Sequence, residues 1–274
     1  MAKLTKKLEK AYAAHNVPVI DGMIIVDGIA VNPLLKDGNT KTGPRVKTFS
    51  TLPGDKEYNT EHGKVKGTCP FTCPGCYGTC GFYNFPDNKN KLAANTVLCR
   101  EHLDTVDAAI RAQLDTLPGV DIRIHATGDF IGDAYAEMWR NIACDYKNNH
   151  FWTYTKVEKY ETLFDGLENA NIVKSLLPFG GFNFGHIEYI FRAYVKLVDM
   201  GAAPYICRCT FDTNQHCQDC RGCIENKYVL FVEHSTGYVA AEDPLFAAAC
   251  EIVDAQKNNP PAVIAARIRE LLNI

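Results

Sequence analysis

The chain has 274 residues, a net charge of −3 at pH 7, and 46% hydrophobic and 22% charged residues. This composition is typical of a folded globular protein and excludes a disordered tail, a collagen-like repeat and a coiled coil. No apolar run approaches the roughly 18 residues that a membrane-spanning helix needs, and the charged N-terminus has no apolar segment behind it. We therefore expect a cytoplasmic protein with no membrane partner. The charge gives no reason to expect a nucleic-acid partner, although a local basic groove would still allow one.

The first part of the chain is predicted to hold little regular structure. A short amphipathic helix over 3–15 precedes a β-hairpin over 23–32, which turns at Asp27-Gly28. Residues 33–68 are rich in glycine and proline and are predicted to be mostly loop around one strand over 45–50.

Helices and strands alternate in the rest of the chain. The alternation from residue 120 onward indicates βαβ units and a largely parallel sheet. We expect an α/β fold whose sheet is either open or curled into a partial (β/α) TIM-like barrel, with a cysteine-rich C-terminal segment. Ligands in such sheets lie at the carboxyl ends of the strands. Helices are predicted over 87–117, 133–147, 158–168, 186–200, 244–257 and 261–272, and strands over 120–126, 150–156, 171–177, 203–209 and 227–235.

The number and the clustering of the cysteines are the unusual features of the composition. The chain has 12 cysteines, of which four lie between positions 69 and 80 and five between 207 and 223. Without a secretion signal, clustered thiols in a chain of this length indicate metal binding rather than a disulfide framework.

The first group has the spacing CxxxCxxC at Cys69, Cys73 and Cys76, on a loop that is rich in proline and glycine. Three thiolates on such a loop are suited to a 4Fe–4S cluster. One iron of that cluster would then lack a protein ligand and could bind a substrate or cofactor, as the open position of a catalytic zinc does. The alternative is a structural zinc site that also uses Cys80.

The second group offers five thiols, enough for a complete site with four ligands. Its late CxxCxxC run suits either an auxiliary 4Fe–4S cluster or a zinc knuckle. We expect the last three cysteines to bind, with one of the first two as the fourth ligand, and His216 or His234 as possible replacements. The cysteines are Cys207, Cys209, Cys217, Cys220 and Cys223.

These motifs resemble known families. A CxxxCxxC loop followed by βα units is similar to the radical S-adenosylmethionine superfamily. The closer resemblance is to the phage- and plasmid-borne gene product 88 family, whose motifs recur in order over roughly residues 38 to 235. The motifs are the GNTKTG segment at 38–43, TCP at 68–70 with CY at 76–77, RIHATGDF at 123–130, YT at 154–155, and the CxxCxxC run at 217–223.

The resemblance implies three regions and a reaction. Residues 1–50 would be a helix and hairpin extension, 51–206 a partial barrel core with the first cluster loop, and 207–274 the second cluster, the last strand and the C-terminal helices. The open iron would bind the amino and carboxylate groups of S-adenosylmethionine. One electron, from a flavodoxin or ferredoxin-type donor, would cleave it to a 5′-deoxyadenosyl radical that acts on an unknown substrate. Such an enzyme would be oxygen-sensitive.

The resemblance also implies a cofactor site. Thr127, Gly128 and Asp129 would stand in place of the GGE turn of the superfamily. Gly128 would let the backbone approach the methionine moiety, and Asp129 would accept from its ammonium group. Tyr77 and Tyr154 are further candidates for contact with the cofactor.

Some of these residues have plainer alternatives. Asp129 would also serve as the N-cap of the helix that follows, and His125 as a hydrogen-bonded core histidine. Lys156, at the next strand end, and the glycine-rich segment 178–185 would be either ligand contacts or ordinary surface features. For the whole chain, the rivals to an enzyme are a zinc-stapled binding or adaptor protein and an iron–sulfur electron carrier that does not use S-adenosylmethionine.

Overall fold

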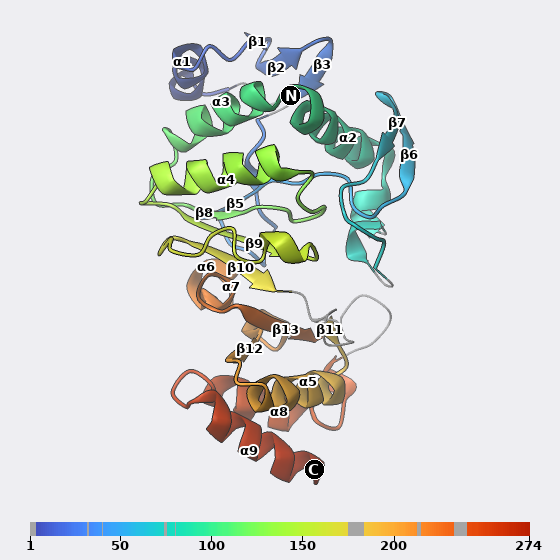
Figure 1. Ribbon diagram of the computed structural model, residues 1–274, viewed down its shortest axis with the longest axis vertical. Helices are drawn as coiled ribbons and strands as arrows, with labels where there is room; N and C mark the ends of the chain where they lie inside the picture. Colours follow the sequence, from blue (N-terminus) through green and yellow to red (C-terminus); the bar gives the residue numbers. More distant parts are fainter. Residues whose placement is uncertain are drawn as a thin grey trace.

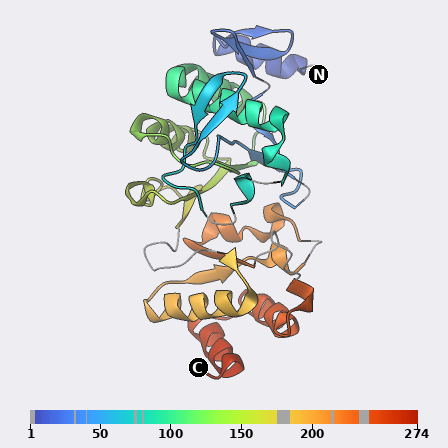
Figure 2. The ribbon, with the colours of Figure 1, turned by 90° about the vertical axis from the view of Figure 1, so that its right-hand side faces the viewer.

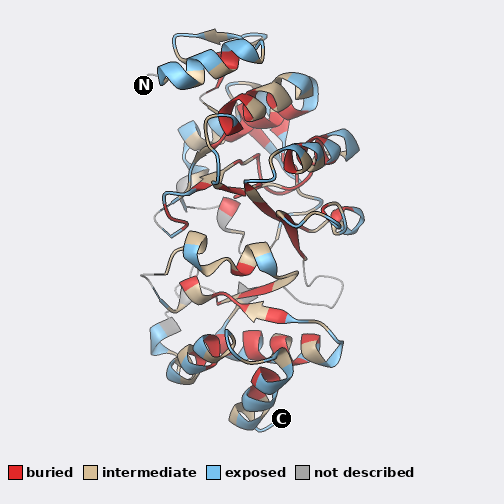
Figure 3. Ribbon diagram, turned by 90° about the vertical axis from the view of Figure 1, so that its left-hand side faces the viewer, coloured by how far each residue is buried: buried red, intermediate tan, exposed pale blue. Residues whose placement is uncertain are grey.

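The computed structural model describes residues 4–31, 33–39, 41–73, 76–79, 81–174, 184–212, 215–232 and 240–274. The molecule is elongated, with the N-terminal elements at one end and the C-terminal helices at the other (Figure 1). It has two large hydrophobic cores, one formed before residue 174 and the other after residue 184. Buried residues accordingly gather in separate zones of the two halves (Figure 3).

The first half is built on a sheet with the strand order β10-β9-β8-β5-β4. The pairs from β5 to β10 are parallel and only β4 is antiparallel, so the chain is a mixed α/β protein. The described strands do not close into a barrel, and the partial-barrel architecture stays a prediction. The strands are β4 (Lys36–Asp37), β5 (Val46–Thr48), β8 (Asp121–Arg123), β9 (His150–Thr155) and β10 (Ala170–Lys174).

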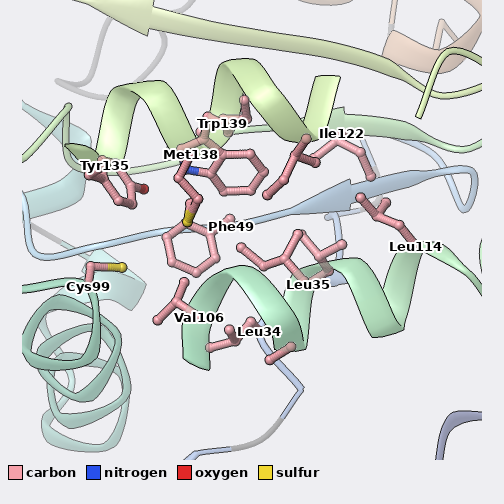
Figure 4. Close-up of a cluster of buried hydrophobic side chains, with 14 of the residues drawn as sticks. Leu34, Leu35, Phe49, Cys99, Val106, Leu114, Ile122, Tyr135, Met138 and Trp139 are labelled. Carbon is pink, nitrogen blue, oxygen red and sulfur yellow. The ribbon is translucent and has the colours of Figure 1, made fainter. Parts of the chain in front are cut away.

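Three helices cover one face of this sheet (Figure 1): α2 (Pro86–Glu101), α3 (Leu103–Leu114) and α4 (Asp133–Asp145). Trp139 of α4 packs edge-on against Phe49, just beyond β5, with ring centroids 5.6 Å apart (Figure 4). Both rings are buried, and aromatic pairs of this kind stabilise a core beyond the area that they bury.

The opposite face of the sheet carries the late cysteines. The short helices α6 (Cys217–Cys220) and α7 (Gly222–Glu225) lie there, and α7 contacts β9 and β10. Trp152 and Tyr154, two residues apart on β9, share this face because side chains alternate along a strand.

The second half contains a sheet with the order β11-β13-β12, in which both pairs are parallel. It begins beside the first sheet, since the Lys174 amide at the end of β10 donates to the Lys227 carbonyl at 2.7 Å. Figure 2 shows its helices, gold to red, gathered toward the C-terminal end. The elements are β11 (Phe184–Gly185), α5 (Ile187–Asp199), β12 (Pro204–Ile206), η5 (Arg208–Thr210), β13 (Tyr228–Val232), η6 (Ala240–Glu242), α8 (Phe246–Ala255) and α9 (Pro261–Leu272).

The N-terminal segment forms the predicted helix and hairpin. The hairpin turns at Asp27 and Gly28, whose φ angles of +47° and +79° suit the tight turn expected there. The predicted region 1–50 also includes β5, which pairs with β8 in the first sheet. The elements are α1 (Lys6–Ala14), β1 (Val19–Ile20), β2 (Met23–Val26) and β3 (Ile29–Val31).

Two local predictions are wrong. The stretch predicted as loop contains an antiparallel hairpin of β6 (Glu57–Thr60) and β7 (Gly63–Lys66). Its strands bury only Tyr58 and Val65, too few apolar residues to show a period of two.

The predicted helix over 158–168 is instead a 3-10 turn, η3 (Glu158–Tyr160), followed by further turns. Its backbone hydrogen bonds span three residues, as from Leu163 to Tyr160 and from Leu167 to Phe164. Tyr160 and Phe164 still reach the first core, which explains the helical spacing of the apolar residues.

Within the described ranges, no helix is both long and apolar enough to cross a membrane.

Candidate metal centres

The first cysteine group lies between β7 and α2, beyond the carboxyl end of β5. The Cys69 amide donates to the Gly54 carbonyl at 3.1 Å. The Cys76 amide donates to the Cys73 carbonyl at 3.2 Å and closes a turn just before η1 (Tyr77–Thr79), which η2 (Gly81–Asn84) follows. All three cysteine residues are partly exposed.

Hydroxyl groups fix this loop to the ends of β5 and β8. The Thr51 amide donates to the Thr127 carbonyl at 3.1 Å, and the Thr127 hydroxyl donates back to the Thr51 carbonyl at 2.9 Å. Thr68, next to the first cysteine, accepts from the Asp129 amide at 2.9 Å and donates to the Leu52 carbonyl at 3.1 Å. The cysteine loop is therefore anchored to the turn predicted to bind the cofactor.

Asp129 is fully buried and joins the ends of β8 and β9. Its carboxylate accepts from the Phe130 amide and the Thr155 hydroxyl, both at 2.8 Å, and from the Lys156 amide at 2.9 Å. The N-cap alternative is wrong, because the residue before α4 is Gly132 and no side chain caps that helix. A carboxylate has about four acceptor positions, of which these three donors fill three.

Lys156 lies among the three thiols of the first group. Its ammonium group hydrogen-bonds with Cys73 and is close enough to Cys69, Cys76 and Asp129 for charge interactions. Burial disfavours the charged ammonium, yet attraction to Cys73 and Asp129 raises the pKa of Lys156. One ammonium group thus interacts with all three thiols, which places these cysteines in the same neighbourhood, and three cysteines are a donor set that an iron–sulfur cluster can use.

Tyr58 is a neighbour of this group that the sequence did not reveal. Its hydroxyl donates to the Pro53 carbonyl at 2.8 Å. Burial, together with the nearby Cys76 and Cys69, raises the pKa of Tyr58 to about 12. Its strand β6 was predicted as loop, so no pattern pointed to this contact.

In the second group, one thiol contacts three others. Cys209 shares hydrogen bonds with Cys207, Cys217 and Cys220. These bonds raise the pKa of Cys209 and lower those of Cys217 and Cys220 to about 7 and 5. Cys223 stands beside this set and accepts from the Tyr154 hydroxyl at 2.9 Å.

Tyr154, predicted to contact the cofactor, thus directs its hydroxyl to the second group. Tyr77 begins η1, and its side chain lies outside the described part of the chain. Cys80, His234 and residues 178–183 of the glycine-rich segment also lie outside it. Within the described ranges, no group of three or more histidine, cysteine or carboxylate side chains is arranged so that it could hold a metal ion.

A family model described as gene product 88 matches residues 33–177, more than half of the chain. The chain belongs to the gene product 88 family. No curated protein matches it, and no solved structure does. The part matched by the gene product 88 model contains the first cysteine group, the turn at Gly128 and Asp129, and Lys156, whereas the second cysteine group follows it.

Gly128 lies in the part matched by the gene product 88 model, and its backbone closely approaches the Thr51 side chain. Its φ is +92°, and a Cβ there would lie 2.0 Å from the Thr51 hydroxyl oxygen. We expect Gly128→Ala to cost about 1–2 kcal/mol in backbone strain and a further 1–3 kcal/mol in crowding. The Gly119→Ala variant measures the backbone strain alone, because Gly119 has a φ of +71° and a Cβ there would have no atom within 4 Å. Equal losses of unfolding free energy for the two variants would contradict the close approach.

His125 lies in the same matched region. It is a buried core histidine, which is the alternative to a site residue that the sequence allowed for it. Its ring nitrogens contact the Tyr135 hydroxyl at 2.8 Å and the Thr153 hydroxyl at 3.2 Å. Burial, with a smaller effect of Lys156, lowers the pKa of His125 to about 3.

In the unfolded chain, His125 therefore takes up a proton near pH 6.5. In the folded protein, the same residue stays neutral until about pH 3. Stability from this residue is present above pH 6.5 and falls as the pH drops below it, by about 1.4 kcal/mol per unit. His125→Asn, which tolerates the local φ of +60°, should lose this slope in urea unfolding between pH 6.5 and 4.5. An unchanged slope would show that other groups cause it.

Proposed function

We propose that the protein is an iron–sulfur enzyme of the radical S-adenosylmethionine type, with a 4Fe–4S cluster on Cys69, Cys73 and Cys76. The observation that carries this proposal is that the Lys156 ammonium group, just beyond β9, hydrogen-bonds with Cys73 and interacts by charge with Cys69 and Cys76. Three thiolates leave one iron of such a cluster open to a cofactor. The carboxyl edge of a parallel sheet is also where ligands bind in α/β folds.

A cluster held by Cys69, Cys73 and Cys76 would supply the one-electron reduction that cleaves S-adenosylmethionine. The Lys156 ammonium offsets the negative charge of the thiolates. The turn at Gly128 and Asp129 is the proposed contact for the methionine moiety, with the Asp129 carboxylate as acceptor for its ammonium group. The side chain that Gly128 lacks makes room for the Thr51 and Thr68 hydroxyls. Thr127 holds the turn through its hydrogen bonds to Thr51.

The enzyme needs a one-electron donor of the flavodoxin or ferredoxin type. A thiolate-bound cluster of this kind is oxygen-sensitive, and the reducing cytoplasm suits both the cluster and its free thiols.

The test is cleavage of S-adenosylmethionine by anaerobically purified, dithionite-reduced protein. We expect 5′-deoxyadenosine and methionine as products and a changed EPR spectrum of the reduced cluster when S-adenosylmethionine is added. A cluster whose spectrum does not respond, with no product, would identify an electron carrier instead. Colourless protein that contains zinc and no sulfide would identify a zinc-stapled binding protein.

A further inference from the structure

The second cysteine group differs from the first, because its thiols contact one another rather than a lysine. Cys209 hydrogen-bonds with Cys207, Cys217 and Cys220, so four sulfurs form one contact set. Cys223 lines the same cavity and accepts from Tyr154, but it is not among the thiols that hydrogen-bond with Cys209. The thiol that the contact set leaves out is therefore Cys223.

The space among these cysteines is small. The cavity that they line together with Trp152 and Tyr205 has a volume of about 10 Å³, roughly the smallest that holds one water molecule. A zinc ion bound at about 2.3 Å by four thiolates needs sulfurs only ~3.8 Å apart. In a 4Fe–4S cluster each thiolate binds a different iron of a bulky core, so the sulfurs stand farther apart.

The surrounding backbone holds the four thiols in place. The Cys217 amide donates to the Lys41 carbonyl at 3.1 Å, and the Cys207 amide donates to the Leu230 carbonyl at 2.8 Å. Gly222 packs under the Tyr205 ring so closely that a Cβ would lie 2.3 Å from it. A cluster would have to push these segments apart, whereas a single ion replaces the shared thiol protons.

We propose that Cys207, Cys209, Cys217 and Cys220 form a mononuclear tetrathiolate site for Zn²⁺, rather than the auxiliary iron–sulfur cluster that the spacing suits equally well. With four thiolates the ion has no open position, so the site is structural. The zinc site would link α6 to the end of β12. The hydrogen bond from the Cys217 amide to the Lys41 carbonyl also connects it to the segment between β4 and β5 of the first sheet. The proposal does not depend on the chemistry of the first group.

The wild-type protein tests the metal. Protein purified in air should contain about one zinc per chain, and zinc X-ray absorption should show four sulfur neighbours at about 2.3 Å. The Cys73→Ala variant, made anaerobically, should retain this zinc and contain no iron or acid-labile sulfide. Iron with sulfide in that variant, or no zinc, would overturn the proposal. Loss of iron from the first group in the wild type would leave the zinc result unaffected.

Two serine variants test the ligand set. Cys209→Ser, which removes the thiol that contacts the three others, should reduce the zinc content at least tenfold. Cys223→Ser, its matched control in the same group, should keep the full content. The reverse pattern, or equal loss in both, would overturn the assignment. If Cys209→Ser does not fold, the four-sulfur shell of the wild-type zinc decides the question.

Discussion

Replacing Cys73 by alanine is expected to remove the iron and acid-labile sulfide of the first site, about four of each per chain, and all formation of 5′-deoxyadenosine. Two thiolates cannot hold a cluster that three share, and Cys73 is the thiol that hydrogen-bonds with Lys156. Because Cys73 is partly exposed, its loss leaves no large cavity in a core. Iron analysis and product chromatography measure both effects.

Cys144→Ala is the matched control. Cys144 is also a partly exposed free thiol, but it lies on α4, away from both cysteine groups. This variant should keep its iron and its product formation. Iron content in Cys73→Ala equal to that of the control would contradict the placement of the cluster.

Removing the Asp129 carboxylate should cause the largest loss of stability at the site, about 3–5 kcal/mol for Asp129→Ala. The substitution leaves three buried donors without their acceptor: the Phe130 amide, the Thr155 hydroxyl and the Lys156 amide. It also leaves the Lys156 ammonium without the nearby negative charge of Asp129. Urea unfolding gives the change in free energy, and a lowered iron content should accompany it.

Asp133→Ala is the control for this prediction. Asp133 lies four residues further along and hydrogen-bonds with Lys159 and Tyr160, but its side chain is 79% exposed. Exposed pairs contribute little to stability, so the effect should be much smaller. Similar losses in both variants would show that Asp129 does not link β8 to β9.

Local patterns in the sequence predicted most elements of the fold. The hairpin at Asp27-Gly28 was predicted because that dipeptide accepts the positive φ angles of a tight turn. The hairpin of β6 and β7 was missed because its strands bury one apolar residue each. The turns after Val157 were predicted as a helix because Tyr160 and Phe164 have helical spacing.

The sequence also pointed to the two cysteine groups, since ligands of one site are often close in the chain. It could not show that Lys156 meets Cys73, because that contact depends on how β9 lies beside the loop before α2. The same holds for Tyr154, which meets Cys223 only once α7 packs on the sheet. Contacts between distant segments are set by packing, which no local pattern encodes.

The content of iron, acid-labile sulfide and zinc in anaerobically purified protein is the most direct test of the first cysteine group as a cluster site. We expect about four irons and four sulfides per chain, together with one zinc. Zinc without iron or sulfide would contradict the cluster on Cys69, Cys73 and Cys76 and the radical chemistry proposed for it.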